Sequence, residues 1–516
     1  MSTMPIKRQT VKKDNLSQKK NLIILLILFL YFCLGLLSIV NHEPWRDELQ
    51  TWLVAKESKT IGELFHNIRY EGHPSLWFLI LFGISKISDR FFFVQILHLS
   101  IATCAVSAFL FFAPFTKLQK VLFVFSYFLF FEFCVISRNY ILGITLLFFY
   151  CVVYQKIPRN IILLSIILFF VCQTSVSGLI IAICLEAITS IELVFQKSRE
   201  KRRARQKINI FIHFVIFFLG IAIFFLTILP PKDFSFGGDW NFSLEAKRAA
   251  KTLTMIWKVF FPFPKLSLHF WNTNVLDFFF VGKLIEIIFS LLIFGFIIFL
   301  FLRRPILLFF FLSATLGILA FSYFRYLGFL RHFGHVFIVF IITFWLKNSF
   351  NPIEVRSNIL EKLAILCEAR ASTIILFVLI IQFASGLFSV GMDWIKPFSA
   401  SKEASEFIKK EGLDKLLIIG SKDYAVSPVA FYINKNIFYP TSESYGSFVK
   451  WTKRRKHKSC DEIARISWQL LTKNRKNILI ILNYDCPFEN KKIRKIAEFK
   501  KSIVTDEIYN LLLVVN

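Results

Sequence analysis

Long apolar runs recur along the chain from residue 22 to residue 390. Runs of about 20 apolar residues predict helices that span a bilayer, because the lipid core offers no hydrogen-bond partner to an exposed backbone. The first run has no small-residue cleavage site after it, so we expect it to remain in the protein as an anchor. The pattern therefore predicts an α-helical polytopic membrane protein with about 11 transmembrane helices. These lie at residues 22–40, 91–112, 121–136, 141–154, 161–171, 178–195, 208–229, 284–302, 306–324, 336–346 and 372–390.

One further apolar stretch, Leu76–Ile87, is shorter than the others. As a helix it would be roughly 18 Å long, whereas the hydrocarbon core of a bilayer is about 30 Å thick. We expect this segment to form a half-inserted or re-entrant helix rather than a span.

The composition supports the membrane class, and the positions of the Lys and Arg residues explain the high net charge. Hydrophobic residues make up 56% of the 516, and 65 residues are Phe, which excludes an ordinary soluble globular domain. The formal net charge of +28 would suit a nucleic-acid partner, but the Lys and Arg residues lie between apolar runs. Such clusters are typical of cytoplasmic loops, so we expect no nucleic-acid binding. The densest cluster, residues 196–207, contains seven Lys or Arg.

The basic clusters also predict the topology. A cytoplasmic N-terminus places the loop of residues 41–73 outside the membrane. The clusters at Lys117, Lys156 and residues 197–207 then all lie inside if only one crossing separates the loop from Lys117, which agrees with a re-entrant Leu76–Ile87. We expect a cytoplasmic N-terminus (1–20), a transmembrane domain (21–392) that contains the external loop (41–73), and an extracytoplasmic domain (399–516).

The C-terminal part differs in composition from the rest of the chain. It is charged, and its helical and strand-like runs alternate, which predicts a small α/β domain outside the membrane. Cys460 and Cys486 both belong to it and could pair in an oxidising compartment. The expected elements are a helix at residues 401–412 and strands at residues 416–419, 437–439, 478–482 and 511–515.

Most of the chemistry-bearing side chains of the transmembrane part lie in the loop of residues 41–73. Asp47 and Glu48 form a carboxylate pair at the predicted outer face, which suggests a reaction on a lipid-borne substrate. Successive helical residues diverge by about 100°, so the two carboxylates cannot both point at one atom. We expect one to be a catalytic base and the other a structural or binding partner. Further His and acidic residues of the loop are His42, Glu43, His66, Glu71 and His73.

Local signals in this loop are helical. Asp47 could instead serve as the N-cap of a short helix through Ala55, which is its structural alternative. Thr60 and Glu63 form a capping-box pattern before an amphipathic stripe, which predicts a helix lying on the membrane surface. Trp45 and Trp52 fit an interfacial aromatic belt better than a sugar-stacking role.

Cationic side chains recur at the same predicted face. Arg325, Arg331, His332 and His335 lie within eleven residues of an otherwise apolar hairpin, and Arg138 lies in the joint between two spans. Taken singly, such Arg residues could anchor the helix ends to lipid headgroups. Guanidinium groups also bind phosphate through two parallel hydrogen bonds, so the combination predicts an anion site.

The chain resembles the GT-C superfamily of membrane glycosyltransferases, which includes protein O-mannosyltransferases and the aminoarabinose transferase that modifies lipid A. The matching motifs lie in the order expected of that superfamily, within residues 20–345. Ser75 stands where many relatives carry a second proline, and no metal-binding DxD motif lies near Arg138. The motifs are Trp45-Arg46-Asp47-Glu48, Gly72-His73-Pro74-Ser75-Leu76 and Ser137-Arg138-Asn139-Tyr140.

The resemblance implies helices that lie flat on the outer face and a sugar donor linked to polyprenyl phosphate. It carries the catalytic role to Asp47, with Glu48 in second place. No cofactor and no metal site are expected. The residues expected to bind substrate are Arg46, His73, Arg138, Tyr140, Arg325, Arg331, His332 and His335.

The residue types agree with such a reaction independently. Glycosyl transfer to a hydroxyl group needs a base for the acceptor proton and cations for the departing phosphate. We therefore expect an inverting membrane glycosyltransferase that moves a sugar from a polyprenyl-phosphate donor to a glycan, lipid or protein acceptor. Its expected location is the bacterial inner (plasma) membrane, in contact with membrane lipids, and its reaction is expected on the extracytoplasmic face.

Three other interpretations remain open at this point. The first is a transporter or flippase of lipid-linked sugars, which buried charges such as Glu132 and Glu186 and inverted repeats would favour. The second is a non-enzymatic membrane scaffold. The third is a zinc site in the loop, although the spacings fit no compact zinc signature. Its ligands would come from His42, Glu43, Asp47, His66 and His73.

Overall fold

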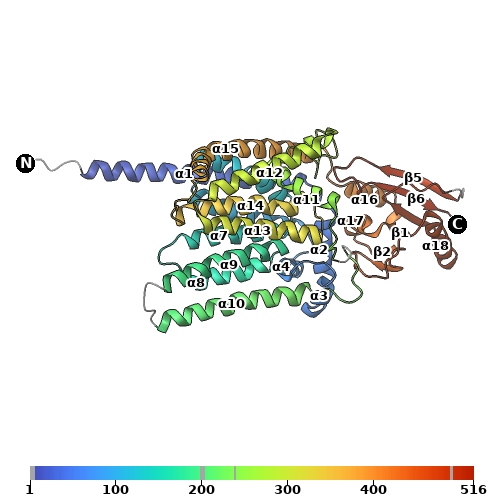
Figure 1. Cartoon of the computed structure of the whole chain (residues 1–516). Helices are drawn as coiled ribbons and strands as arrows, with labels where there is room; N and C mark the ends of the chain where they lie inside the picture. Colours follow the sequence, from blue (N-terminus) through green and yellow to red (C-terminus); the bar gives the residue numbers. More distant parts are fainter. Residues whose placement is uncertain (1–5, 198–203, 237–239, 489–491, 516) are drawn as a thin grey trace, which may run out of the picture.

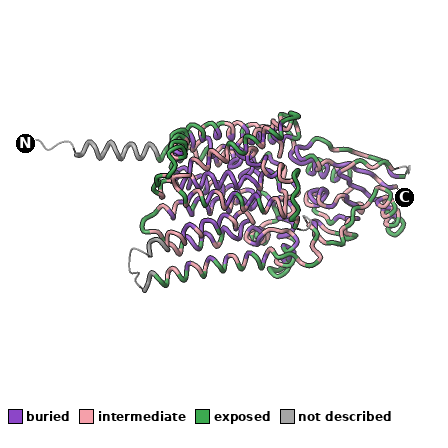
Figure 2. The backbone as a smooth tube through the Cα atoms, viewed as in Figure 1, coloured by how far each residue is buried: buried purple, intermediate pink, exposed green. Residues whose placement is uncertain are grey.

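The computed structural model describes residues 6–197, 204–236, 240–488 and 492–515. A bundle of long helices ends on one side at an α/β unit, and the N-terminal helix extends from the opposite end of the bundle (Figure 1). Part of the basic cluster, residues 198–203, lies outside the described residues. The interior of the bundle is buried and its periphery is exposed (Figure 2), as expected of helices that face lipid.

The expected spans are present as helices. Within the described residues, nine helical segments are long and apolar enough to cross a membrane, and α4, α7 and α8 are shorter apolar helices. The chain is a multi-pass α-helical membrane protein. The helices of the bundle are α1 (Ile6–Asn41), α4 (Ser75–Ser85), α5 (Phe92–Phe112), α6 (Lys117–Val124), α7 (Tyr140–Tyr154), α8 (Ile161–Cys172), α9 (Val176–Lys197), α10 (Ala204–Ile228), α12 (Gly282–Phe301), α13 (Pro305–Phe324), α14 (Leu330–Leu346) and α15 (Asn358–Ile395).

The third expected span departs from a regular α-helix. After α6 the chain turns at Ser126, whose hydroxyl accepts a hydrogen bond from Leu129 N–H at 3.3 Å, and continues as a π-helix, η1 (Tyr127–Val135). Gly386 of α15 lies against this turn, where a Cβ atom would come within 2.9 Å of the backbone of Ser126 and Tyr127. Side-chain hydropathy reports only that such a segment is apolar, so the sequence could not predict this break.

Short helices cover the end of the bundle that faces the α/β unit. Thr60 caps α3, since Glu63 N–H donates to Thr60 Oγ1 at 3.1 Å, and the Glu63 carboxylate accepts the N–H of the preceding residue, Lys59, at 2.9 Å. Gly72 adopts φ +66° between α3 and α4, a conformation that glycine adopts without steric cost. The short elements are α2 (Arg46–Glu57), α3 (Ile61–Ile68), α11 (Ala246–Phe260) and η2 (Val275–Phe278). A further short helix, η3 (Lys347–Ser349), directly follows α14.

The α/β unit contains one six-stranded mixed sheet in the order β3-β2-β1-β4-β6-β5. β1 pairs in parallel with β2 and β4, while β4 pairs antiparallel with β6, whose residue Leu512 lies opposite Ile480. The helix and the four strands expected from the sequence are confirmed; β3, β5, α17 and α18 were not expected. The elements are α16 (Ser401–Lys410), η4 (Leu413–Lys415), β1 (Leu417–Ser421), α17 (Asp423–Ile433), β2 (Ile437–Tyr439), β3 (Ser444–Gly446), α18 (Cys460–Asn474), β4 (Ile478–Leu482), β5 (Ile493–Phe499) and β6 (Tyr509–Val514).

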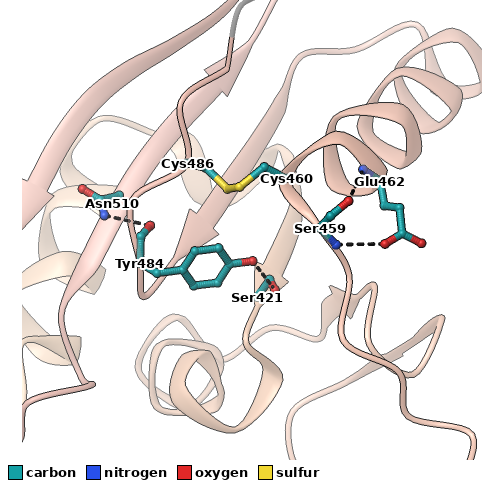
Figure 3. The surroundings of a disulfide bond; sticks show 7 residues. All are labelled: Ser421, Ser459, Cys460, Glu462, Tyr484, Cys486 and Asn510. Carbon is teal, nitrogen blue, oxygen red and sulfur yellow. Dashed lines mark hydrogen bonds between the residues drawn. A yellow bond between two sulfur atoms is a disulfide. The ribbon is translucent and has the colours of Figure 1, made fainter.

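A disulfide bond joins Cys460 at the start of α18 to Cys486 beyond β4 (Figure 3), with a Cα–Cα distance of 5.8 Å. Ser459 and Glu462 cap α18 next to the disulfide. The Tyr484 hydroxyl and Ser421 Oγ share a hydrogen bond of 3.0 Å. The pairing left open by the sequence is therefore present. The other seven cysteines are free thiols.

Candidate active site

The loop of residues 41–73 places Asp47 and Glu48 in different surroundings. Glu48, not Asp47, caps helix α2, because its carboxylate accepts the backbone N–H of Trp45 at 3.3 Å. The alternative role of Asp47 as the N-cap is wrong, because α2 starts at Arg46 and Asp47 lies in its first turn. Asp47 is thus free of a capping role, and its side chain retains 28% exposure.

Glu48 is fully buried in a polar network that holds the loop onto the bundle. One carboxylate oxygen accepts the Ser137 backbone N–H at 2.6 Å, and the other lies 3.0 Å from His42 Nε2. His42 Nδ1 in turn lies 2.9 Å from the carboxylate of Asp393 on α15. Burial lowers the pKa of His42, but the two carboxylates outweigh it and raise that pKa to about 10. His42 is therefore a buried imidazolium between two carboxylates, which positions α2 and the Ser137-Arg138 joint.

Asp47 lies at the meeting point of two arginines from distant segments. Its Oδ2 accepts a hydrogen bond from Arg331 Nη2 at 2.8 Å, and its backbone carbonyl accepts one from Arg138 Nη1. Burial raises the pKa of the Asp47 carboxyl, but Arg331, Arg138 and Arg46 outweigh burial and hold the pKa below its ordinary value. Asp47 is therefore a carboxylate at neutral pH.

Arg331 is enclosed by aromatic rings. Its guanidinium carbon lies 5.1 Å from the Trp45 ring centroid, 5.4 Å from that of Trp271 and 4.9 Å from that of Phe329. Trp271 is fixed by its Nε1–H, which donates to Glu132 at 3.0 Å. The side chains of Arg331 and Arg138 are buried, whereas an arginine that anchors to headgroups is exposed. The anchoring alternative for these two residues is therefore wrong.

Arg138 is oriented through its backbone as well as its side chain. His98 of α5 lies 2.9 Å from the Arg138 carbonyl and 3.1 Å from that of Cys134, a role that its lone position in an apolar run did not reveal. Arg138 Nη2 donates to His73 Nε2 at 3.3 Å. Burial, and then the charge of Arg138, lower the pKa of His73 to about 3, so its imidazole is neutral and accepts this hydrogen bond.

A cavity of about 260 Å³ opens beside these groups. Asp47 and Arg331 lie on its wall, and Arg138 donates to the backbone carbonyl of Asp47. The Nε atoms of both Arg138 and Arg331 are buried and have no hydrogen-bond partner among the described residues. The cavity is lined by Trp45, Arg46, Asp47, Gln50, Phe236, Tyr326, Phe329, Arg331, Tyr424, Ser427, Trp451 and Asp506.

Arg46 joins the loop to the α/β unit. Its Nη1 donates to Asp506 at 2.6 Å, and its backbone N–H donates to Glu507 at 3.0 Å. Burial raises the pKa of Glu507 to about 7, with Arg46 opposing. Asp506, Glu507 and the aromatic residues of the α/β unit were not expected at the site, because no local motif in the C-terminal sequence indicates that they face Asp47.

Other predicted binding residues do not line this cavity. His332 Nδ1 accepts the backbone N–H of Phe329 at 2.9 Å and so caps α14. His335 Nδ1 lies 3.1 Å from the His332 carbonyl, and Tyr140 packs between the two imidazoles with ring centroids at 5.9 and 5.4 Å. Arg325 donates to the Phe236 carbonyl at 3.4 Å. These four residues support the walls rather than the cavity itself.

The predicted interfacial belt is also wrong for Trp45 and Trp52, since both are buried inside the protein. Trp45 packs edge-on against Trp271 with centroids 4.7 Å apart, and Trp52 packs against Phe91. In the part of the chain that the structure describes, no three His, Cys, Asp or Glu side chains converge as a metal site would require.

No known family profile and no curated protein matches the chain. A search of solved structures finds ArnT from Cupriavidus metallidurans, in a crystal structure bound to undecaprenyl phosphate and in another in the apo state. The identities are 11% and 10% and the TM-scores 0.48 and 0.49, and each match covers 95% of this chain and 98% of the other. Identities and TM-scores this low give no information on the function of this chain.

Proposed function

We propose that the chain is a GT-C-type membrane glycosyltransferase that takes a sugar from a polyprenyl-phosphate donor and passes it to a hydroxyl group outside the membrane. One observation carries the proposal: Asp47 and Arg331, from two distant segments, line one cavity on the side of the bundle that faces the α/β unit, and Arg138, from a third segment, donates to the Asp47 carbonyl. The motifs shared with the GT-C superfamily support it and place Asp47 as the catalytic carboxylate.

In the proposed reaction, the Asp47 carboxylate takes the proton of the acceptor hydroxyl. The acceptor oxygen then forms a bond to the anomeric carbon as the bond from that carbon to the phosphate oxygen breaks, which inverts the anomeric configuration. The bonding electrons leave with the polyprenyl phosphate. A side-chain base within hydrogen-bond reach of such a proton typically contributes about 10²–10⁴-fold to the rate.

The arginines suit the charge that develops on the leaving group. A polyprenyl-phosphate sugar is a phosphodiester with one negative charge, whereas the released polyprenyl phosphate is a monoester that carries more. Cations fixed at the phosphate therefore stabilise the transition state more than the bound donor, which is the condition for catalysis. Arg331 and Arg138 both have a buried Nε atom without a hydrogen-bond partner among the described residues, and Arg331 and Arg46 are the two arginines that line the cavity.

In the structure Arg331 pairs with Asp47, which keeps the carboxylate a weak base. Donor phosphate bound at Arg331 competes for the same guanidinium and weakens this pair. The carboxylate then becomes more basic when a donor is present, as proton removal requires. Glu48 has no such role in the proposal, because its carboxylate is fully used by His42, Trp45 and Ser137.

We further propose that the α/β unit lies on the extracytoplasmic side, as the basic clusters predict. The disulfide between Cys460 and Cys486 supports an oxidising environment for this unit. In that orientation the site faces the compartment in which a lipid-linked sugar donor would be used.

The test is an analysis of glycans and lipids in a strain that lacks the gene. We expect one envelope component to lose one sugar residue, and the wild-type gene to restore it when supplied again, whereas Asp47→Asn does not. An unchanged set of sugars in the deletion strain, with all growth conditions matched, would overturn the proposal.

A further inference from the structure

The α/β unit contributes an aromatic wall to the cavity. Tyr424 at the start of α17 and Trp451 in the loop between β3 and α18 both line it, and both residues are only partly buried. Their ring planes lie at 22° to each other with centroids 6.1 Å apart. Asp47 and Arg331, the proposed base and phosphate ligand, line the same cavity.

Several contacts hold Trp451 in place. The Arg455 guanidinium lies 4.2 Å from the Trp451 ring centroid and is fixed by two hydrogen bonds to Asp423, at 2.6 and 2.9 Å. The edge of Phe236 packs against Trp451 with centroids 4.6 Å apart. The Trp451 carbonyl accepts the backbone N–H of Ser235 at 2.9 Å, so the loop after α10 is joined to the α/β unit at this residue. Trp451 is therefore positioned before any ligand arrives.

Polar groups border the aromatic faces. Arg46 lies between Trp45 and Tyr424, with ring centroids at 5.1 and 5.4 Å from its guanidinium carbon. Asp506 uses one carboxylate oxygen to accept from Arg46, and its side chain remains 38% exposed. An ionised carboxylate offers about four lone-pair sites, so Asp506 retains acceptor capacity for hydroxyl groups.

We propose that this wall, formed by Tyr424, Trp451 and Asp506, is the acceptor subsite and that the acceptor is itself a carbohydrate. A sugar ring has an apolar face of C–H groups and a rim of hydroxyl groups, which matches an aromatic face bordered by a carboxylate and a guanidinium. The acceptor hydroxyl would then lie between this wall and Asp47, where its proton can be removed. The inference rests on the proposed function and narrows it to transfer from a lipid-linked donor onto a glycan.

The test uses the purified full-length protein in detergent with membranes from the deletion strain, which supply both the endogenous donor and the unmodified acceptor. Mass spectrometry of the product locates the new glycosidic bond. We expect the bond to join the transferred sugar to a sugar ring. If the wild-type protein attaches the sugar to a polypeptide side chain or to a lipid headgroup without sugar, the inference is wrong although the proposed function stands. If the wild-type protein transfers nothing, the proposed function itself fails.

The role of the wall is tested with Trp451→Ala and Trp451→Phe. Because an aromatic contact contributes up to about tenfold in affinity, we expect Trp451→Ala to raise the apparent KM for extracted acceptor glycan by about tenfold. Trp451→Phe should restore most of the affinity, and kcat should stay near the wild-type value in both variants. Trp468→Ala is the matched control, since Trp468 belongs to the same unit but does not line the cavity.

Two results would overturn the assignment of this wall. One is an unchanged acceptor KM in Trp451→Ala. The other is a raised KM for the donor with an unchanged KM for the acceptor, which would place the prenyl chain or the donor sugar against Trp451. Thermal unfolding of each variant in detergent shows whether a change in KM reflects the site or a loss of folded protein.

Discussion

Arg331 and Asp47, 284 positions apart in the sequence, form an ion pair of 2.8 Å at the wall of the candidate active site. The pair places the proposed base next to the proposed phosphate ligand, so one cavity holds both groups that the proposed glycosyl transfer needs. Three aromatic rings surround Arg331, which fixes the guanidinium and excludes water from one side of it.

Replacement of Asp47 by Asn tests the proposed base. The amide keeps the size of the side chain but cannot take a proton, so we expect the transfer rate to fall by at least about 10²-fold. The measurement is transfer per folded protein with deletion-strain membranes. Glu48→Gln is the comparison: it should mainly lower the thermal stability, because Glu48 is buried against His42 and Ser137. Near-normal transfer by Asp47→Asn would remove Asp47 from the mechanism.

Arg331→Lys and Arg138→Lys test the phosphate site. Lysine keeps the charge but loses the planar fork that binds phosphate through two hydrogen bonds, so donor binding should weaken by about 1–3 kcal/mol in each variant. Arg325→Lys is the matched control, since Arg325 donates to the Phe236 carbonyl, whereas Arg331 and Arg138 donate to Asp47. Donor affinity is measured in detergent, where headgroup contacts play no part. Equal affinities in all four proteins would show that the phosphate binds elsewhere.

The pH dependence of stability should report on His42. Its pKa is raised from 6.5 to about 10. The ion pairs of His42 therefore contribute fully to the free energy of unfolding below pH 6.5. This contribution declines above pH 6.5 and is lost as the pH rises through about 10. His42→Gln leaves Glu48 and Asp393 buried without their cation, which should cost about 3–5 kcal/mol near neutral pH. The Tm difference between wild type and this variant should therefore be largest near pH 6 and shrink toward pH 10. His66→Gln, on an exposed position of α3, is the control. A Tm difference that does not vary with pH would contradict a protonated His42.

Cysteine labelling in intact cells tests the topology. Ile157, in the loop between α7 and α8, is 92% exposed, and Tyr445 in β3 of the α/β unit is 56% exposed. In a protein whose seven free cysteines have been replaced, a reagent that does not cross the membrane should label Tyr445→Cys and leave Ile157→Cys unlabelled. The reverse pattern would place the candidate site on the cytoplasmic side and contradict the positive-inside prediction.

The hydropathy pattern predicts most of the membrane architecture, because apolar runs of sufficient length have few alternatives in lipid. It also predicts the short apolar helix that follows Pro74 and four of the six strands, because length and apolar content decide these elements locally. It could not predict the π-helix at Tyr127–Val135, which depends on how Gly386 of α15 approaches the turn at Ser126.

The sequence predicts those residues of the candidate site that belong to a GT-C-like motif or lie at the predicted outer face of the membrane. Asp47, Arg138 and Arg331 were expected at one face and do meet there. Trp451 and Asp506 were not expected, because nothing in their local sequence indicates contact with a loop hundreds of residues earlier. Tyr140 and His335 were expected at the site but support its walls, since hydropathy and spacing do not show which side of a helix faces the cavity.

The pairing of Arg46 with Asp506, 460 positions later, also affects the biosynthesis of the protein. Membrane proteins are made and inserted from the N-terminus, so the loop that carries Asp47 emerges long before the segment that fixes Arg46 next to it. A partly synthesised chain can have many of its helices in the membrane and still lack one wall of the cavity. The cavity is therefore complete only after residues 506–507 have left the ribosome and the α/β unit has folded against the loop.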